Sequence, residues 1–289
     1  MTICEKNSGF HVALTIAGSD SGGGAGIQAD LRAFRAAGVF GCSAIAAVTA
    51  QNPTNVLRID PVPPESLRDQ IEAVVSVFRI GAVKTGMLFS AELIRTVVAA
   101  LKKMNCPVVV DPVMVSTSGV RLLRQDAIRA VCEDLLPEAD WITPNMPEAE
   151  LLLDRKLNSF EDLLSGAEEL GRLFHCGVVL KGGHAESDPE ARDAVFFEGG
   201  RMVLCSPRIP TLPHAAHGTG CTFSAALAAG LARGLSPEHS LTNAKRFVFD
   251  SLAGASPVSR ADVPLVAAMP PGTPYGPGNN LNEVRLVCL

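Results

Sequence analysis

The sequence predicts an α/β protein built on a mostly parallel, doubly wound sheet with helices on both faces. Short apolar segments rich in valine, isoleucine and alanine alternate with longer segments in which apolar residues recur at helical spacing. The short segments are apolar on both faces, as parallel strands are when helices cover each side of a sheet. This alternation favours a right-handed succession of strand, helix and strand in a three-layer α/β/α fold.

Each predicted element rests on its own local pattern. Compact runs of β-branched and small apolar residues predict strands at 12–17, 42–48, 82–85, 108–111, 141–143 and 178–181. Helical periodicity predicts helices at 27–37, 66–78, 91–104, 125–135 and 160–174, followed by alanine-rich helices at 222–232 and 237–254. Runs at 193–197 and 201–205, joined by Glu198-Gly199-Gly200, predict a hairpin near the sheet edge.

We expect one domain over residues 1–289, with its core at about 12–255. No internal repeat and no sharp linker divides the sequence, and 289 residues suit one large α/β domain. Five prolines between positions 264 and 277 predict that residues 264–289 form an extended C-terminal tail.

Composition and charge exclude several function classes. The 25 Lys and Arg against 30 Asp and Glu give a net charge of −5, and the chain has one Trp and one Tyr, so we expect no nucleic-acid partner. The eight cysteines include no C-x-x-C pair, and no secretory leader pattern is present, so we expect reduced thiols in the cytoplasm. The uncharged stretch 36–57 is interrupted by glycines and a proline, which leaves too few apolar residues for a membrane span of ~20 residues.

A glycine-rich segment, residues 18–26, directly follows the first predicted strand and precedes a helix. So many glycines let the backbone approach a ligand, and the position at the carboxyl end of a strand favours a binding site. The spacing fits neither the dinucleotide-binding fingerprint nor a P-loop. The alternative is a flexible turn without a ligand.

A second glycine-rich turn, His217-Gly218-Thr219-Gly220-Cys221-Thr222, opens an alanine-rich helix. Free N–H groups and the positive end of the helix converge there, which suits the charge on a phosphoryl group in transit. A thiol at a helix start has a lowered pKa, so Cys221 is a candidate base. The alternative is a buried cysteine that only packs at the helix end.

Polar residues also follow other predicted strands. Asp111 and the pair Asn145 and Glu148 could organise Mg²⁺, although Asn-x-Pro-Glu is also an ordinary helix start. Lys181 could place an ammonium near phosphates, or could simply be solvated. The amide of Gln51 offers a donor and an acceptor that match the edge of an aminopyrimidine. His214 and His217 have metal-like spacing without supporting ligands, so no metal site is expected between them.

Taken together, these motifs resemble the hydroxymethylpyrimidine/phosphomethylpyrimidine kinase family of thiamine biosynthesis, in the ribokinase-like superfamily. The likeness extends in order over about residues 12–255. It rests on residues 14–30, Thr49-Ala50-Gln51-Asn52, Lys84-Thr85-Gly86-Met87, Asp111-Pro112-Val113-Met114, Thr143-Pro144-Asn145, Leu180-Lys181-Gly182-Gly183-His184 and residues 217–222.

The resemblance implies a ribokinase-like fold and roles for particular residues. Residues expected to line the pyrimidine pocket are Gly18, Asp30, Gln51, Met87 and Val113. The anion hole is expected at Gly218, Thr219 and Gly220, with Cys221 as catalytic base. Lys181, Asn145 and Thr219 are expected to contact ATP, and Asp111 and Glu148 to organise Mg²⁺. A cytoplasmic homodimer is also implied.

The sequence departs from the family at two places. Ala215 and Ala216 stand where Asn-Thr is usual, and the tail after residue 274 only faintly matches the family's closing segment. The function expected is ATP- and Mg²⁺-dependent phosphorylation of 4-amino-5-hydroxymethyl-2-methylpyrimidine and of its monophosphate. The alternatives are a pyridoxal or pyridoxine kinase and, more remotely, a nucleotide-binding regulator without transfer activity.

Overall fold

The computed structural model describes residues 10–114, 123, 125–183, 189–209, 216–257, 266–267 and 284–289, and in them strands and helices alternate as predicted. The strands are β1 (Val12–Asp20), β2 (Phe40–Asn52), β3 (Asn55–Pro61), β4 (Ile80–Thr85), β5 (Val108–Val110), β6 (Trp141–Ile142), β7 (Gly177–Leu180), β8 (Glu190–Phe197), β9 (Gly200–Pro207), β10 (Ser256–Pro257), β11 (Val266–Ala267) and β12 (Arg285–Cys288). The helices are α1 (Gly26–Ala36), α2 (Pro64–Val75), α3 (Ala91–Leu101), α4 (Gln125–Ala130), α5 (Met146–Leu153), α6 (Phe160–Phe174), α7 (Thr219–Ala232) and α8 (Pro237–Ala253).

Within the described residues, ten strands form one mixed sheet in the order β12-β9-β8-β7-β6-β5-β4-β1-β2-β3. The six strands β1, β2 and β4 to β7 run parallel, whereas β3 pairs antiparallel at one edge and β8, β9 and β12 at the other. The chain passes from β1 to β2 on one side and returns to β4 on the other side of β1. Loops diverge at such a switch point, so the carboxyl ends of β1 and β4 favour a ligand site.

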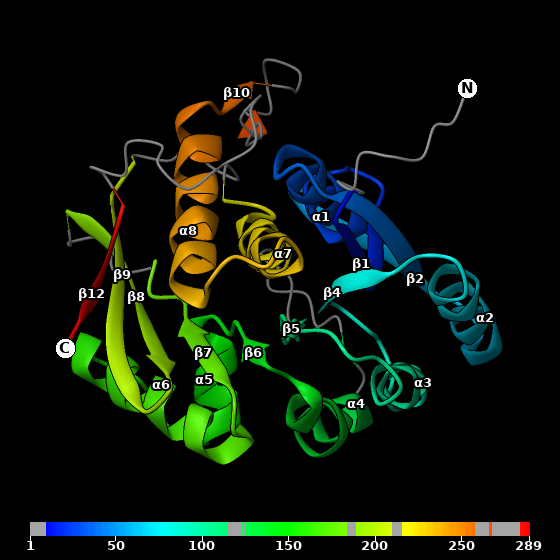
Figure 1. Cartoon of the computed structure of the whole chain (residues 1–289), viewed down its shortest axis with the longest axis horizontal. Coiled ribbons are helices and arrows are strands. Elements are labelled where there is room, and N and C mark those ends of the chain that lie inside the picture. Colours follow the sequence, from blue (N-terminus) through cyan, green and yellow to red (C-terminus); the bar gives the residue numbers. More distant parts are fainter. Residues whose placement is uncertain are drawn as a thin grey trace, which may run out of the picture.

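Helices cover both faces of the sheet, as Figure 1 shows with the sheet between them. On one face α1, α7 and α8 bury an apolar layer that includes Phe34, Leu227 and Phe247. On the other face α2, α3, α4 and α6 bury a larger layer that includes Ile94 and Leu170. The three-layer α/β/α prediction is therefore confirmed. None of the helices in the described ranges is long and apolar enough to cross a membrane.

The structure also corrects the predicted elements. Strand β3 was not predicted, because its side chains are mostly exposed and it carries little apolar signal. The helix predicted at 125–135 continues as α4 only to Ala130 and then changes to a π-helical turn, Val131–Leu135, and a 3₁₀ turn, Leu136–Glu138. Most of the predicted extended tail, residues 264–289, lies outside the described residues. Its end forms β12, which pairs antiparallel with β9.

Candidate active site

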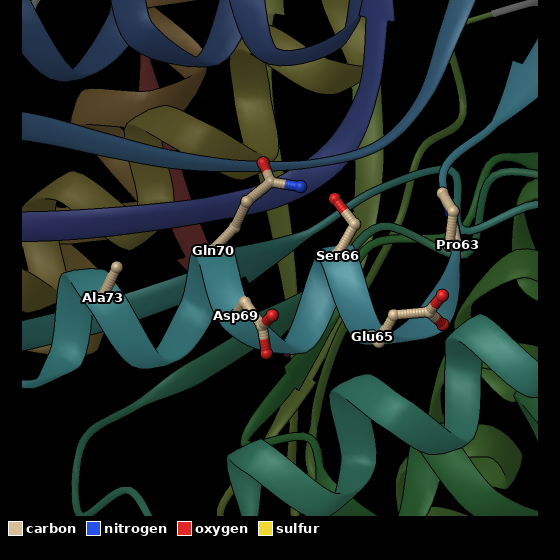
Figure 2. Close-up of a pocket in the computed structure, with 6 residues that line it drawn as sticks. All are labelled: Pro63, Glu65, Ser66, Asp69, Gln70 and Ala73. Atoms are coloured by element: carbon tan, nitrogen blue, oxygen red, sulfur yellow. The ribbon is translucent and has the colours of Figure 1, made fainter.

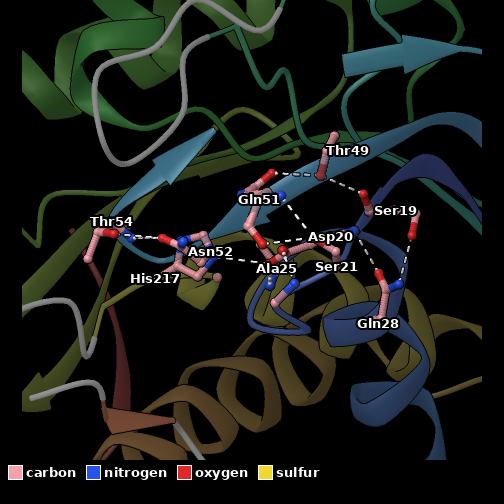
Figure 3. Close-up of polar contacts among 12 residues, drawn as sticks. Ser19, Asp20, Ser21, Ala25, Gln28, Thr49, Gln51, Asn52, Thr54 and His217 are labelled. Atoms are coloured by element: carbon pink, nitrogen blue, oxygen red, sulfur yellow. Dashed lines mark hydrogen bonds and ion pairs between the residues drawn. The ribbon is translucent and has the colours of Figure 1, made fainter. Parts of the chain in front are cut away.

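The glycine-rich turn after β1 is closed by the side chain of Asp20 (Figure 3). Asp20 Oδ1 accepts a hydrogen bond from the Gly22 N–H at 2.8 Å, and Oδ2 accepts one from the Ala25 N–H at 2.8 Å. Burial raises the pKa of Asp20, but hydrogen bonds from His217, Ala25 and Gly22 outweigh burial and hold it below its ordinary value. The carboxylate is therefore charged and shapes the turn from inside.

His217 joins this turn to the second one, which opens α7. Its Nε2 lies 3.1 Å from Asp20 Oδ2, and both side chains are buried. Gly218 has a φ of +80°, and a Cβ there would overlap the carbonyl oxygen of Gly24. The two turns thus meet backbone to backbone. Among the described residues, His217 and Asp20 belong to no group of three or more potential metal ligands, and His214 lies outside those residues.

The first turn of α7 provides the candidate anion hole. Both the N–H and the hydroxyl of Thr219 bond to the carbonyl oxygen of Ala216, at 3.2 and 2.8 Å. The resemblance implies that Thr219 donates to an anion. In this conformation both of its donors instead hold the turn together. The next N–H groups, of Gly220 and Cys221, belong to the first helical turn, where N–H groups have no acceptor within the helix.

An ion pair between the partly buried Lys181 and the buried Asp111 lies next to Gly220. Lys181 Nζ donates to Asp111 Oδ1 at 3.0 Å, and a Cβ on Gly220 would lie 3.1 Å from that ammonium. Burial lowers the pKa of Lys181, but Asp111 and Glu148 outweigh it and raise the pKa above its ordinary value. Burial raises the pKa of Asp111, yet Lys181 and Lys84 bring it below its ordinary value. Both partners are charged at neutral pH.

Asn145 and Glu148 form a capping box at the start of α5. Asn145 Oδ1 accepts from the Glu148 N–H at 2.9 Å, and Glu148 Oε2 accepts from the Asn145 N–H at 2.8 Å. The helix-start interpretation is therefore confirmed, and Glu148 also interacts electrostatically with Lys181 and Asp111. Burial, with Asp111 nearby and despite Lys181, raises the pKa of Glu148 to about 7. Lys181 therefore offsets only part of the cost of burying the charged Glu148 carboxylate.

The described residues contain no group of three or more His, Cys, Asp or Glu side chains arranged to hold a metal ion. Magnesium, however, commonly takes only one or two carboxylates and completes its shell with water and substrate phosphates. Asp111 and Glu148, which interact electrostatically, fit that limited donor set. A cation beside them would also supply the counter-charge that Glu148 lacks.

The structure reverses the expected pKa shift of Cys221. Burial raises the pKa of this thiol to about 11; Lys84 and the Gly26 N–H lower it, whereas Asp30 and Asp111 raise it further. The helix start was expected to dominate, but burial and the two carboxylates outweigh it. The thiol is protonated at neutral pH in the ligand-free protein.

The resemblance implies that Asp30 lines the pyrimidine pocket, and the structure shows how its carboxylate is held. Asp30 is fully buried, and its carboxylate accepts from the Thr15 hydroxyl at 2.6 Å and from Lys84 Nζ at 2.8 and 2.9 Å. Lys84 is fully buried as well, and Asp30 raises its pKa against the effect of burial. Sequence reasoning missed this lysine as a site residue, although a lysine within an apolar strand was a usable signal. The pair lies close enough to Cys221 to act on the pKa of its thiol.

The other residues expected to line the pyrimidine pocket lie near these turns. The Gly18 N–H donates to the Met87 carbonyl oxygen at 3.1 Å, and a Cβ on Gly18 would lie 2.6 Å from Met87 Cε. Gln51 is partly exposed, and its backbone N–H donates to Ser21 Oγ at 2.8 Å (Figure 3). Its side-chain Oε1 accepts from the Thr49 hydroxyl at 3.1 Å. Val113 borders a small cavity of about 10 Å³ with Gly86, Leu88, Asp111, Pro112, Leu123, Val131 and Leu135.

A wider depression of about 510 Å³ lies along α2, lined by Pro63, Glu65, Ser66, Asp69, Gln70 and Ala73 (Figure 2). Its lining comes from one helix and the residue before it. Gln70 points from that helix to β2, where its amide bonds the N–H and carbonyl oxygen of Ile45 at 2.8 and 3.2 Å. The depression shares no residue with the two glycine-rich turns, and we assign no chemistry to it.

The start of α7 lies over the Lys181–Asp111 pair at the carboxyl ends of a mostly parallel sheet, and the fold is that of the ribokinase-like kinases. The sequence profile described as phosphomethylpyrimidine kinase matches residues 20–266, and the chain belongs to this family.

Individual relatives agree with that assignment. The hydroxymethylpyrimidine/phosphomethylpyrimidine kinase of Bacillus subtilis is 44% identical over 84% of this chain and 89% of its own length. The phosphomethylpyrimidine kinase of Clostridium difficile superimposes with a TM-score of 0.73 at 38% identity, over 83% of this chain and 98% of that one. The pyridoxal kinase of Staphylococcus aureus, in complex with ADP, has a TM-score of 0.84 at 30% identity, over 98% of this chain and 100% of that one.

Proposed function

We propose that this chain transfers the γ-phosphoryl group of ATP to the hydroxyl of 4-amino-5-hydroxymethyl-2-methylpyrimidine and then phosphorylates the resulting monophosphate. The product is the pyrimidine diphosphate of thiamine biosynthesis. Family membership and the named relatives support this substrate class. The observation that carries the proposal is the position of the first turn of α7, which lies over the Lys181–Asp111 pair and against the turn closed by Asp20.

This arrangement suggests how the phosphoryl group is stabilised. The N–H groups of Gly220 and Cys221 would donate to its oxygens, at the positive end of α7. Lys181 would place its ammonium at the same point, since only the absence of a side chain at Gly220 leaves that approach open. Such preorganised donors are worth most while charge moves between donor and acceptor.

Cys221 is the proposed base for the first transfer. The hydroxyl of the substrate must lose a proton as it attacks phosphorus, and a thiolate could accept that proton. Because the pKa of Cys221 is about 11, only a small thiolate fraction exists at neutral pH. The second transfer starts from a phosphate monoester that is already largely dianionic, so it has no comparable proton to remove.

Asp111 and Glu148 are the residues that would hold Mg²⁺. The bound ion would offset the negative charge of the phosphates. Its arrival would also favour the charged form of Glu148, whose pKa burial raises to about 7. Asn145 would then act indirectly, through the capping box that orients Glu148.

Pyridoxal phosphorylation is the second candidate function. The observation that favours it is the likeness to the pyridoxal kinase of Staphylococcus aureus over 98% of this chain. The amide of Gln51 favours the pyrimidine, because a side-chain amide can pair with an amino group beside a ring nitrogen. A pyridine ring with a phenolic oxygen presents no such edge.

Identification of the products tests the proposal. The purified chain would be incubated with ATP and Mg²⁺ and, in parallel, with hydroxymethylpyrimidine, pyridoxal or pyridoxine, and products would be assigned by mass spectrometry. We expect the pyrimidine mono- and diphosphate in sequence, and neither when EDTA removes divalent metal. Formation of pyridoxal phosphate without any pyrimidine phosphate would favour the second candidate.

We further propose a single-domain homodimer in the cytoplasm. Large apolar side chains are exposed at Phe40 on β2, Leu57 on β3 and Val77 after α2, with 48, 73 and 77% exposure, and Leu57 supports association through the edge strand β3. Sedimentation equilibrium of the wild type and of Leu57→Lys tests it. A monomeric wild type would contradict the dimer.

A further inference from the structure

We propose that Asp193 is a positioning residue for Lys181. Its carboxylate, paired with Lys245 of α8, fixes the turn after β7 and thereby holds the Lys181 ammonium beside Asp111. This inference rests on the proposed function, in which Lys181 contacts the phosphates.

The geometry links α8 to the site through one carboxylate. Asp193 Oδ2 accepts from Lys245 Nζ at 2.7 Å, while Oδ1 accepts from the Gly182 N–H at 3.0 Å. Strand β8 pairs antiparallel with β7, with Leu180 opposite Ala194, so Asp193 lies across from the end of β7. The residue next to Gly182 is Lys181, whose Nζ binds Asp111. The Asp193 side chain thus orients the backbone directly next to Lys181.

The turn after β7, residues 181–183, packs closely against neighbouring segments, so a small shift of those segments would change its backbone conformation. A Cβ on Gly182 would overlap the carbonyl oxygen of Arg192 in β8. On the other side, the Lys181 N–H donates to the Pro144 carbonyl oxygen at 2.9 Å. Arg208 Nη1 donates to the Gly183 carbonyl oxygen at 2.9 Å. Of these contacts, the bond to Asp193 is the one made by a buried charged side chain.

Stability alone does not account for the pair. Asp193 and Lys245 are 4% and 7% exposed, so both charges have lost most of their hydration. A buried ion pair often contributes no more to stability than apolar residues of similar volume. A carboxylate does, however, accept a bond from a backbone N–H more strongly than a neutral group can. The pair therefore suits a role in fixing the turn.

Two charge-free double variants separate positioning from charge balance. Asp193→Asn/Lys245→Met retains an acceptor for the Gly182 N–H, whereas Asp193→Leu/Lys245→Met removes it. Both avoid leaving one charge buried without its partner. Asp193→Ala/Lys245→Met repeats the second variant with a smaller side chain, in case leucine prevents folding.

We expect the asparagine variant to keep near-normal turnover of hydroxymethylpyrimidine with Mg²⁺ and ATP. The leucine and alanine variants should unfold at a similar temperature to the asparagine variant but lose about 10- to 100-fold in kcat, the usual cost of misplacing a reacting group. Hydrogen exchange at the Gly182 amide should be faster in these two variants only. Equal kcat and equal exchange in all three variants would overturn the inference.

Lys181→Met distinguishes this inference from the proposed function. If Lys181→Met turns over substrate normally, the proposed role of Lys181 is wrong. If Lys181→Met is inactive while the leucine and asparagine double variants are equally active, only the positioning role of Asp193 is wrong. The exchange measurement does not depend on any substrate, so it tests the Asp193–Gly182 link even if the pyrimidine is not phosphorylated.

Discussion

Gly218 lies against Gly24 so closely that their backbones touch, although 194 positions separate them in the sequence. The contact requires two properties of Gly218 at once: its φ of +80° and the absence of a Cβ, which would overlap the Gly24 carbonyl oxygen. It brings the turn after β1 against the start of α7. In the proposed function, the turn after β1 holds the pyrimidine and the start of α7 holds the phosphoryl group.

Gly218→Ala should therefore separate the two turns. We expect turnover to fall by about 100-fold or more, because a displacement of about 1 Å can cost that much. The matched control is Gly234→Ala, since Gly234 has a φ of +72° but nothing within 4 Å of its would-be Cβ. The control should lose only about 1–2 kcal/mol of stability, the cost of a Cβ in the left-handed region, and retain normal kinetics. Equal kinetic defects in the two variants would show that backbone conformation, and not the contact, matters.

Cys221→Ala should impair the two phosphorylations unequally. Phosphorylation of the alcohol should fall by roughly 100- to 10,000-fold, the range for loss of a general base. Phosphorylation of the monophosphate should fall distinctly less, because its acceptor oxygen is already deprotonated. Steady-state kinetics with each acceptor would measure both effects. Equal losses on both acceptors would refute the base role and leave Cys221 a packing residue.

The same residue predicts a pH profile for the wild type. Because the pKa of Cys221 is raised to about 11, the thiolate fraction increases with pH throughout the neutral and mildly alkaline range. From pH 8 to pH 10, kcat/KM for the alcohol should rise by up to about tenfold per pH unit. Cys221→Ala should lack this slope. A profile that is flat in the wild type would contradict a thiolate base.

The fold was largely predictable from local patterns, and its exceptions have physical reasons. Residues 160–174 show helical periodicity and form α6 with those bounds. Strand β3 escaped prediction because an exposed edge strand has little apolar signal, and β12 because its pairing with β9 depends on distant chain segments.

The residue types of the candidate site could be predicted from the sequence, but the pairs that its side chains form could not. The motif containing Lys181 and the turn containing Cys221 were identifiable from glycines next to strand and helix ends. The pairs Asp30–Lys84 and Asp20–His217, 54 and 197 positions apart, depend on packing of the whole sheet. The direction of the Cys221 pKa shift depends on the same packing, because burial outweighs the local effect of the helix start.

Gln51→Leu tests recognition of the ring. It keeps most of the side-chain volume but removes both hydrogen-bonding groups, so transition-state stabilisation for the pyrimidine should fall by about 1.5–3 kcal/mol. The KM for ATP should change little. Gln70→Leu is the control, since among the described residues Gln70 bonds to the backbone of Ile45, and the change should affect stability but not substrate use. Unchanged pyrimidine kinetics in folded Gln51→Leu would end this assignment.

Glu148→Gln should alter how stability depends on pH. Burial raises the pKa of Glu148 from an ordinary value of 4.5 to about 7 in the folded state. The folded state therefore binds more protons than the unfolded state between these values, so the free energy of unfolding falls as pH rises through that window. At about 1.4 kcal/mol per pKa unit, the wild type should lose up to about 3 kcal/mol by pH 8.

The variant lacks this titration and keeps an acceptor for the Asn145 N–H. Relative to the wild type, ligand-free Glu148→Gln should gain stability between pH 4.5 and pH 8 in urea unfolding experiments. Glu148→Gln should also bind Mg²⁺ with nucleotide more weakly than the wild type does. Glu133→Gln, on an exposed side chain, is the control and should follow the wild type. A stability difference that does not change with pH would contradict the assigned pKa.

In the proposed function, this site phosphorylates an aminopyrimidine alcohol in preference to a pyridine. The most direct measurement is a competition in one vessel, with hydroxymethylpyrimidine and pyridoxal at equal concentration, limiting Mg²⁺–ATP, and products quantified by mass spectrometry. The product ratio equals the ratio of the two kcat/KM values. We predict at least about a tenfold preference for the pyrimidine, the size expected when one buried amide pair is satisfied or left unmade. Equal use of the two substrates, or a preference for pyridoxal, would contradict the account.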